Sequence, residues 1–211
     1  MKLGKELYKR CIAAGQFMDT ALWQFIFLYT QLHLARTITD ENRALVGIFE
    51  CALAFVSLTV MRQRWVIELA TRKLVFIQLV DLMASLATRF LVIAFPATYM
   101  STVAIRNALL SKLEFAVYQD LENKIFSGEE RTDLSLIVQQ ANTAGALVGA
   151  GISWMIVGVS IQTICILACI FCVISYSYDI ALGYGLKRVV AIELAKKAIL
   201  DRKTLDRCQP L

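Results

Sequence analysis

The feature that most constrains this chain is a series of long apolar segments, several of which contain charged residues. Six segments are each close to the roughly 20 residues that a helix needs to cross a lipid bilayer. They cover residues 13–34, 44–61, 74–95, 97–120, 134–157 and 160–182. The apolar runs are continuous, without the alternation that is typical of a transmembrane β-strand. The sequence therefore predicts an all-α, polytopic membrane bundle of six transmembrane helices.

The placement of Lys and Arg predicts how this bundle is oriented. Most of the 22 basic residues lie before the first segment, between the second and third, between the fourth and fifth, or after the sixth. Cytoplasmic segments of membrane proteins are enriched in Lys and Arg. We therefore expect a multi-pass protein of the cell membrane with both termini cytoplasmic. The same bias accounts for the net charge of +5, so no nucleic-acid partner is expected.

The last part of the chain differs from the rest in composition. We expect residues 1–185 to form the transmembrane domain and residues 186–211 a basic amphipathic cytoplasmic tail. In the tail, Val189, Ile192 and Leu194 alternate with Lys and Arg, a pattern typical of a helix that lies on a membrane surface. The alternative is a solvated helix that caps the bundle. Membrane lipids are expected partners in the first case.

Ionisable residues inside the apolar segments indicate a polar interior. An ionisable group in the middle of a bilayer costs at least about 2.5–3.5 kcal/mol on insertion scales, so such groups usually mark functional sites. Arg106 and Glu114 are eight residues apart and fall along one stripe of the fourth segment. We expect this pair to contact a solute or protons. Asp81 and Arg89 in the third segment are expected to form a structural ion-pair network with Glu50 or Arg106.

Two other patterns concern packing. Gly145 and Gly149 are four residues apart in the fifth segment, a spacing that allows two helices to approach closely in lipid. Cys165, Cys169 and Cys172 lie in an uninterrupted apolar segment, where cysteine packs as a small apolar side chain. No metal ion or other cofactor is therefore expected.

The connection between the second and third segments carries a family resemblance. Residues 64–73 read RWVIELATRK, which is similar to the motif Gly-x-x-x-Asp-x-x-Gly-Arg-Arg/Lys of the major facilitator superfamily. Arg72 and Lys73 match, Glu68 replaces the acid, and both glycines are absent. An arginine in the fourth helix and spaced glycines in the fifth are also similar. The chain thus resembles one six-helix, N-terminal-like half of such a transporter.

The resemblance implies roles for particular residues. Helices 1 and 4 of such a half line the central cavity. The implied candidates for contact with a substrate or protons are Asp19, Gln24, Gln31, Arg106 and Glu114. Together with Asp81 and Arg89, which the sequence alone marks as structural, the expected structural or gating residues are Glu68, Arg72, Lys73, Gly145 and Gly149.

Two functions compete at this point. A complete transporter of this family has two six-helix halves around a site in the middle of the membrane, and this chain supplies one. The first hypothesis is a half-size transporter that works as a homodimer, or with a second half, and moves a small solute by alternating access. The polar faces and the glycines would then meet the partner. The alternative is a non-transporting accessory, immunity or assembly subunit. An enzyme is not expected, because the sequence contains no recognisable nucleophile–base pair, phosphate-binding loop or metal-ligand set.

Overall fold

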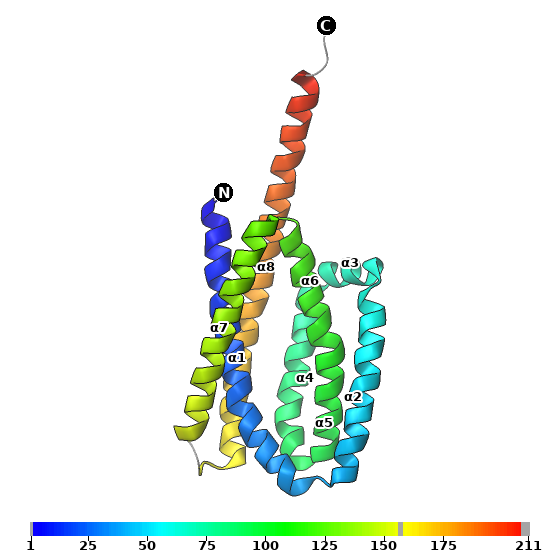
Figure 1. Ribbon diagram of the computed structural model, residues 1–211, viewed down its shortest axis with the longest axis vertical. Helices are drawn as coiled ribbons and strands as arrows, with labels where there is room; N and C mark the ends of the chain where they lie inside the picture. The colour runs from blue at the N-terminus through cyan, green and yellow to red at the C-terminus, as the bar shows by residue number, and fades with distance from the viewer. Residues whose placement is uncertain (1, 156–157, 208–211) are drawn as a thin grey trace.

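The computed structural model describes residues 2–155 and 158–207, and all regular structure in those ranges is helical (Figure 1). The elements are α1 (Lys2–Thr37), α2 (Asp40–Met61), α3 (Arg64–Arg72), α4 (Leu74–Ala94), α5 (Pro96–Ile105), the π-helical turn η1 (Arg106–Ser111), α6 (Lys112–Asn123), α7 (Gly128–Met155) and α8 (Ile161–Arg207). The predicted all-α class is confirmed.

Three helices in the described ranges are long and apolar enough to cross a membrane. They are α2, α4 and the Ile161–Lys196 part of α8. These helices coincide with the second, third and sixth predicted spans. α1, the continuous α5–η1–α6 unit and α7 are more polar, yet they run along the same long axis of the molecule (Figure 1). Both the start of α1 and the end of α8 lie at one end of the bundle (Figure 1). We refer to it as the terminal end.

Short connections reverse the chain at the other end of the bundle. Only Ile38 and Thr39 separate α1 from α2, and only Phe95 separates α4 from α5. Pro96 occupies the first turn of α5, where its missing N–H costs nothing and its fixed φ suits a helix. At the terminal end, the connection between α2 and α4 forms the short helix α3, which crosses that end (Figure 1). The sequence had predicted a link there, not a helix.

The helices pack in a pattern that repeats once along the chain. α1 packs against α7 and α8, and the α5–η1–α6 unit packs against α2 and α4. α4 and α8 also contact each other. If α1, α2 and α4 are matched with α5–α6, α7 and α8 in that order, the contact of α1 with α7 corresponds to that of α5–α6 with α2. The contact of α1 with α8 then corresponds to that of α5–α6 with α4, and the contact between α4 and α8 corresponds to itself. Because α1 and α5–α6 run in opposite directions, the two halves of the chain form an inverted repeat (Figure 1).

The contact between α1 and α7 depends on two glycines. A Cβ atom on Gly145 would lie 2.5 Å from the backbone oxygen of Phe17. On Gly149 it would lie 2.2 Å from the backbone oxygen of Ala21. The expectation that this spacing allows close approach of a helix is therefore confirmed. The expectation that these glycines meet a partner protein is wrong, because α1 of the same chain already covers them.

Apolar clusters occupy both ends of the bundle. At the terminal end, buried side chains such as Tyr8, Leu74 and Leu186 pack together. At the opposite end, Leu34, Val92 and their neighbours form a second cluster. The buried Gln78 and Asp81 lie on α4 between these two clusters. This arrangement places the polar interior in the middle of the molecule.

α8 continues far beyond the bundle. It is one helix of 47 residues and passes residues 185 and 186 without a break. Its last part points away from the other helices instead of lying across their ends (Figure 1). The tail expected as a helix along a surface is thus a straight extension of the last pass.

Candidate functional site

An ion pair at the centre of the bundle joins three elements. Arg106 Nε lies 2.7 Å from Asp81 Oδ1, and Arg106 Nη2 lies 3.1 Å from Asp81 Oδ2. Tyr176 on α8 donates a hydrogen bond to Asp81 and accepts one from Arg106. The Asp81 side chain is only 2% exposed and that of Arg106 13%. This two-point pairing is the strong geometry between arginine and a carboxylate, and it links α4, η1 and α8.

The pairing agrees with one of the partners expected for Asp81. Arg106 and Glu114 are expected to contact a solute or protons together, and this stays a prediction; a π-helical turn from Arg106 to Ser111 lies between them. Arg106 was also named as a possible partner of Asp81, and the structure contains that pair.

A second polar network surrounds Glu114. Gln78 Nε2 lies 2.8 Å from Glu114 Oε1 and 3.2 Å from both the Tyr118 hydroxyl and the backbone oxygen of Asp179. Tyr118 donates to the same Asp179 oxygen at 3.0 Å. Gln78 is fully buried, and its Oε1 has no hydrogen-bond partner among the described residues. The network connects α4, α6 and α8 about one helical turn from the Asp81–Arg106 pair.

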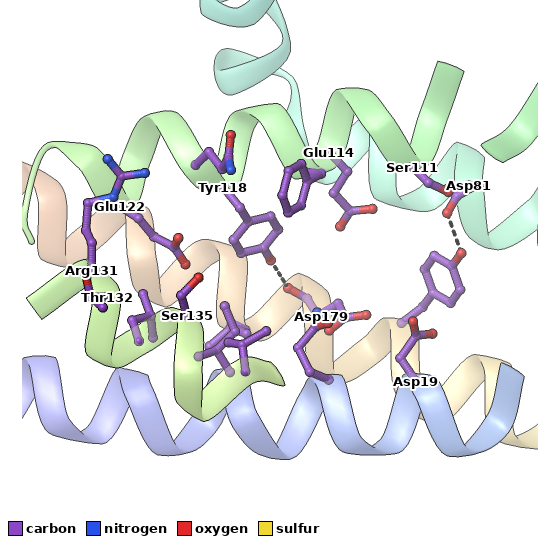
Figure 2. Close-up of a pocket in the computed structure, with 18 of the residues that line it drawn as sticks. Asp19, Asp81, Ser111, Glu114, Tyr118, Glu122, Arg131, Thr132, Ser135 and Asp179 are labelled. Carbon is purple, nitrogen blue, oxygen red and sulfur yellow. Dashed lines mark hydrogen bonds between the residues drawn. The ribbon is translucent and has the colours of Figure 1, made fainter. Parts of the chain in front are cut away.

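Both networks border one partly open cavity. Its volume is about 660 Å³, within the range of cavities that hold small molecules. The lining comes from α1, α4, η1, α6, α7 and α8. The polar lining residues are Gln16, Asp19, Asp81, Arg106, Ser111, Glu114, Tyr118, Gln119, Glu122, Arg131, Thr132, Ser135, Tyr176 and Asp179. Figure 2 shows Asp19, Glu114 and Asp179 facing the same open space.

The predicted substrate-binding residues are only partly brought together. Asp19, Arg106 and Glu114 all line the cavity. Gln24 does not line it. The side chain of Gln31 lies outside the described part of the chain. Of the residues expected on the first and fourth passes, the charged ones thus converge on the cavity.

The predicted structural residues lie in three different places. Glu68 on α3 is at the surface and pairs with Arg64 at 3.1 Å, while Arg72 and Lys73 are exposed. Arg89 is buried, but its hydrogen bond goes to Cys172, at 3.8 Å from Nη2 to Sγ. Its Nε has no partner among the described residues. Arg89 therefore does not join the ion pair of Asp81, and the exposed Glu50 does not either.

Four residues of the site were not predicted from the sequence. Gln78, Tyr118, Tyr176 and Asp179 were missed. Asp179 had a usable signal, because it is an acid inside the helix that carries the sixth apolar segment. Gln78 and the two tyrosines had none, since uncharged polar residues are common in such helices.

Partly buried ion pairs join two helices at the terminal end of the cavity. Lys5 Nζ lies 2.8 Å from Glu130, and Lys9 Nζ lies 3.1 Å from Asp133, so both pairs join α1 to α7. The hydrogen bond from Lys5 lowers the pKa of Glu130 to about 2. Tyr8 donates a 2.6 Å hydrogen bond to Glu122 on α6. Burial nevertheless raises the pKa of Glu122 above its ordinary value.

Comparison with known proteins adds no relative to these observations. No protein-family model, curated protein or solved structure matches the chain. The function must therefore be argued from the cavity and its residues.

Proposed function

We propose that this protein is a half-size membrane transporter that moves a small solute through the cavity by alternating access. In this proposal α1, α2, α4, α5–α6, α7 and α8 each cross the cell membrane, and both termini are cytoplasmic. The observation that carries the proposal is a cavity of about 660 Å³ that extends from the middle of the bundle towards its terminal end and is lined by charged residues. A helix bundle that served only as an anchor would gain nothing from such a lining.

The polar passes fit this proposal. α1, α5–α6 and α7 are less apolar than the other passes, and residues on each of them line the cavity. A transmembrane helix that faces a water-filled cavity can carry ionisable residues on that side. Lys and Arg are concentrated at the terminal end, which supports a cytoplasmic location for it.

The inverted repeat also fits. Many secondary transporters consist of two inverted repeats, with the solute site near the middle of the membrane between them. Here α1 and α5–α6 are the equivalent passes, and both contribute charged residues to the cavity. The order of the helices and the resemblance of residues 64–73 point to a transporter half of the major facilitator type. A second copy or a second half would close the open side of the cavity.

The alternative is a non-transporting accessory or assembly subunit. One observation favours it: the charge of Arg106 is already balanced by Asp81 of the same chain, and Arg106 also donates a hydrogen bond to Tyr176. The arginine of the fourth pass thus needs no partner protein and no solute to balance its charge. In this alternative the Asp81–Arg106 pair only fixes the packing of α4 against η1.

Access from both sides of the membrane separates the two functions without knowledge of the solute. In a variant without its six natural cysteines, Ser111→Cys places one thiol in the cavity lining. A membrane-impermeant maleimide is then applied to intact cells and, separately, to inside-out vesicles. A transporter exposes the thiol to each side in turn, so we expect labelling in both preparations. Labelling from only one side would favour the accessory subunit.

Three control positions define the background. Asn42→Cys, between the first two apolar segments, should react only in intact cells. Glu129→Cys at the start of α7 should react only in inside-out vesicles. Leu136→Cys is exposed on α7 but does not line the cavity, so it reports reactivity at the lipid-facing surface. Labelling of Asn42→Cys from the inside would contradict the proposed topology.

A further inference from the structure

The charges around the cavity are strongly unbalanced. The lining contains five carboxylates and two arginines. The carboxylates are Asp19, Asp81, Glu114, Glu122 and Asp179, and the arginines are Arg106 and Arg131. Arg106 is balanced by Asp81 at 2.7 Å. Arg131 belongs to the first turns of α7 at the terminal end. The middle of the cavity therefore holds Asp19, Glu114 and Asp179 without a neutralising cation among the described residues.

These three carboxylates have few hydrogen-bond donors. Asp19 and Asp179 form no side-chain hydrogen bond or ion pair within the described ranges. Glu114 accepts a hydrogen bond only from the amide of Gln78. Asp179 is close enough to Asp19 and Glu114 for them to repel each other electrostatically. Asp19 is exposed, and Glu114 and Asp179 are half-buried. Three carboxylates gathered around one cavity repel one another unless a cation or bound protons neutralise them.

The dimensions of the site indicate what kind of cation fits. Within residues 2–155 and 158–207, no three acidic, His or Cys side chains are grouped closely enough to hold one metal ion. The cavity is also much larger than an ion, at about 660 Å³. Phe115, Tyr118 and Tyr176 add aromatic surface to the lining. Aromatic rings attract organic cations through their negative faces.

We propose that the cavity binds a small organic cation, with the positive charge between Asp19, Glu114 and Asp179 and the apolar groups against Phe115, Tyr118 and Tyr176. The inference rests on the transport function proposed above, because it names the class of solute for the same cavity. Figure 2 shows the space between Asp19, Glu114 and Asp179 that the charged group would occupy.

Two probes of matched shape and opposite charge test the proposal. Tetraphenylphosphonium is a cation and tetraphenylborate an anion of nearly the same size. Binding of each is measured by isothermal titration calorimetry with the purified full chain in detergent. We expect the cation to bind at least about tenfold more tightly than the anion, which corresponds to about 1.4 kcal/mol. Equal affinity for the two probes would overturn the proposal.

Variants locate the binding of the cation. Asp19→Asn is the first choice, because this carboxylate has no partner in the described structure to lose. It should weaken binding of tetraphenylphosphonium about tenfold, the effect of losing one charge-assisted contact, while Asp19→Glu should retain most of the affinity. Glu129→Gln removes an exposed acid that does not line the cavity and should leave the affinity unchanged. If Asp19→Asn binds the cation as tightly as the natural protein and has the same melting temperature, the cation does not bind in this cavity and the proposal is wrong.

The outcome is independent of the transport assay. If Ser111→Cys is labelled from both sides but no cation binds, the proposed transport function is retained and the proposal of an organic cation as its solute is wrong. If the cation binds but Ser111→Cys is labelled from one side only, the cation site is retained and the proposal of alternating access is wrong.

Discussion

The middle and the terminal end of the bundle both contain pairs of acidic and basic side chains, but the two regions differ in depth. In the middle, Asp81 is 2% exposed and Arg106 13%. At the terminal end, the Lys9 side chain is 8% exposed, but that of its partner Asp133 is 66% exposed. The middle pair has two hydrogen bonds and a tyrosine, and it joins three elements.

This difference indicates which contacts fix the fold. Removing one member of a buried pair leaves a charge without compensation, whereas a pair with one partner in water contributes little. α1 and α7, which the terminal ion pairs connect, also approach each other closely at Gly145 and Gly149. The helices in the middle of the molecule are thus joined by a buried ion pair, and α1 and α7 are joined by close backbone packing.

The largest effect should come from breaking the middle pair. Asp81→Asn leaves the Arg106 charge buried without a carboxylate and should lower the free energy of unfolding by about 3–5 kcal/mol. Thermal unfolding in detergent measures the change. Asp120→Asn is the matched control, because its pair with Lys124 is 37% and 42% exposed. A loss no greater than that of Asp120→Asn would show that depth does not distinguish the two regions.

A double variant distinguishes the contribution of the ion pair to stability from the cost of leaving one charge buried alone. Asp81→Leu with Arg106→Met removes both charges, and such replacements in buried pairs are often neutral or stabilising. We expect the double variant to be more stable than Asp81→Asn in the same unfolding experiment. If the double variant were the less stable of the two, the pair itself would be worth more than the cost of burying it.

The next largest effect concerns the packing of α1 on α7. Gly149→Ala places a Cβ atom 2.2 Å from the Ala21 oxygen, so the two helices must separate. Overpacking of this kind costs about 1–3 kcal/mol, which should appear as a lower melting temperature. Gly151→Ala meets no atom within 4 Å and should be neutral or stabilising, since alanine is the better helix former. Equal effects of the two substitutions would contradict the close approach.

A smaller effect is expected from the terminal ion pairs. Lys9→Met and Asp133→Asn, combined in a double-mutant cycle, should give a coupling energy of about 0.2–1 kcal/mol, as for other exposed pairs. Chemical unfolding in detergent provides the four free energies. A coupling of several kcal/mol would place this pair in the same class as the buried one.

The smallest effect is a dependence on pH at the same end. Lys5 lowers the pKa of Glu130 to about 2, below its value in the unfolded chain. A lowered folded-state pKa gives stability that is complete above the unfolded pKa, at about 4.3, and is lost as pH falls towards 2. The Glu130 side chain is 39% exposed, so the loss is small. Melting temperatures between pH 6 and pH 3 should fall slightly less in Lys5→Met than in the natural protein.

The helices could be predicted well because each depends on local composition. Each of the six apolar segments lies in a helix or a continuous helical unit along the bundle axis, and three of these helices are long and apolar enough to cross a membrane. α3 was missed because only nine residues, four of them polar, give too short an apolar pattern. The π-helical turn at Arg106 was missed as well, because it depends on how the α5–α6 unit fits its neighbours and not on its own residues.

The site was predictable only as a set of charges. Asp19, Arg106 and Glu114 were recognisable because ionisable residues are rare in apolar segments. The pairing was not, because Asp81 and Arg106 lie on different elements and the sequence does not say which helices are neighbours. Tyr176 was overlooked for the same reason: its role exists only once α8 lies beside α4.

The uninterrupted course of α8 makes it a lever arm. From Asp179 in the cavity wall to Arg207 the helix is continuous, and at 1.5 Å per residue this distance is about 40 Å. A rigid rod of that length converts a tilt of about 5° at the cavity into a displacement of roughly 3–4 Å at its tip. The far end of α8 therefore amplifies small rearrangements around Asp179 and offers a place to read them out with a spin label or a fluorophore.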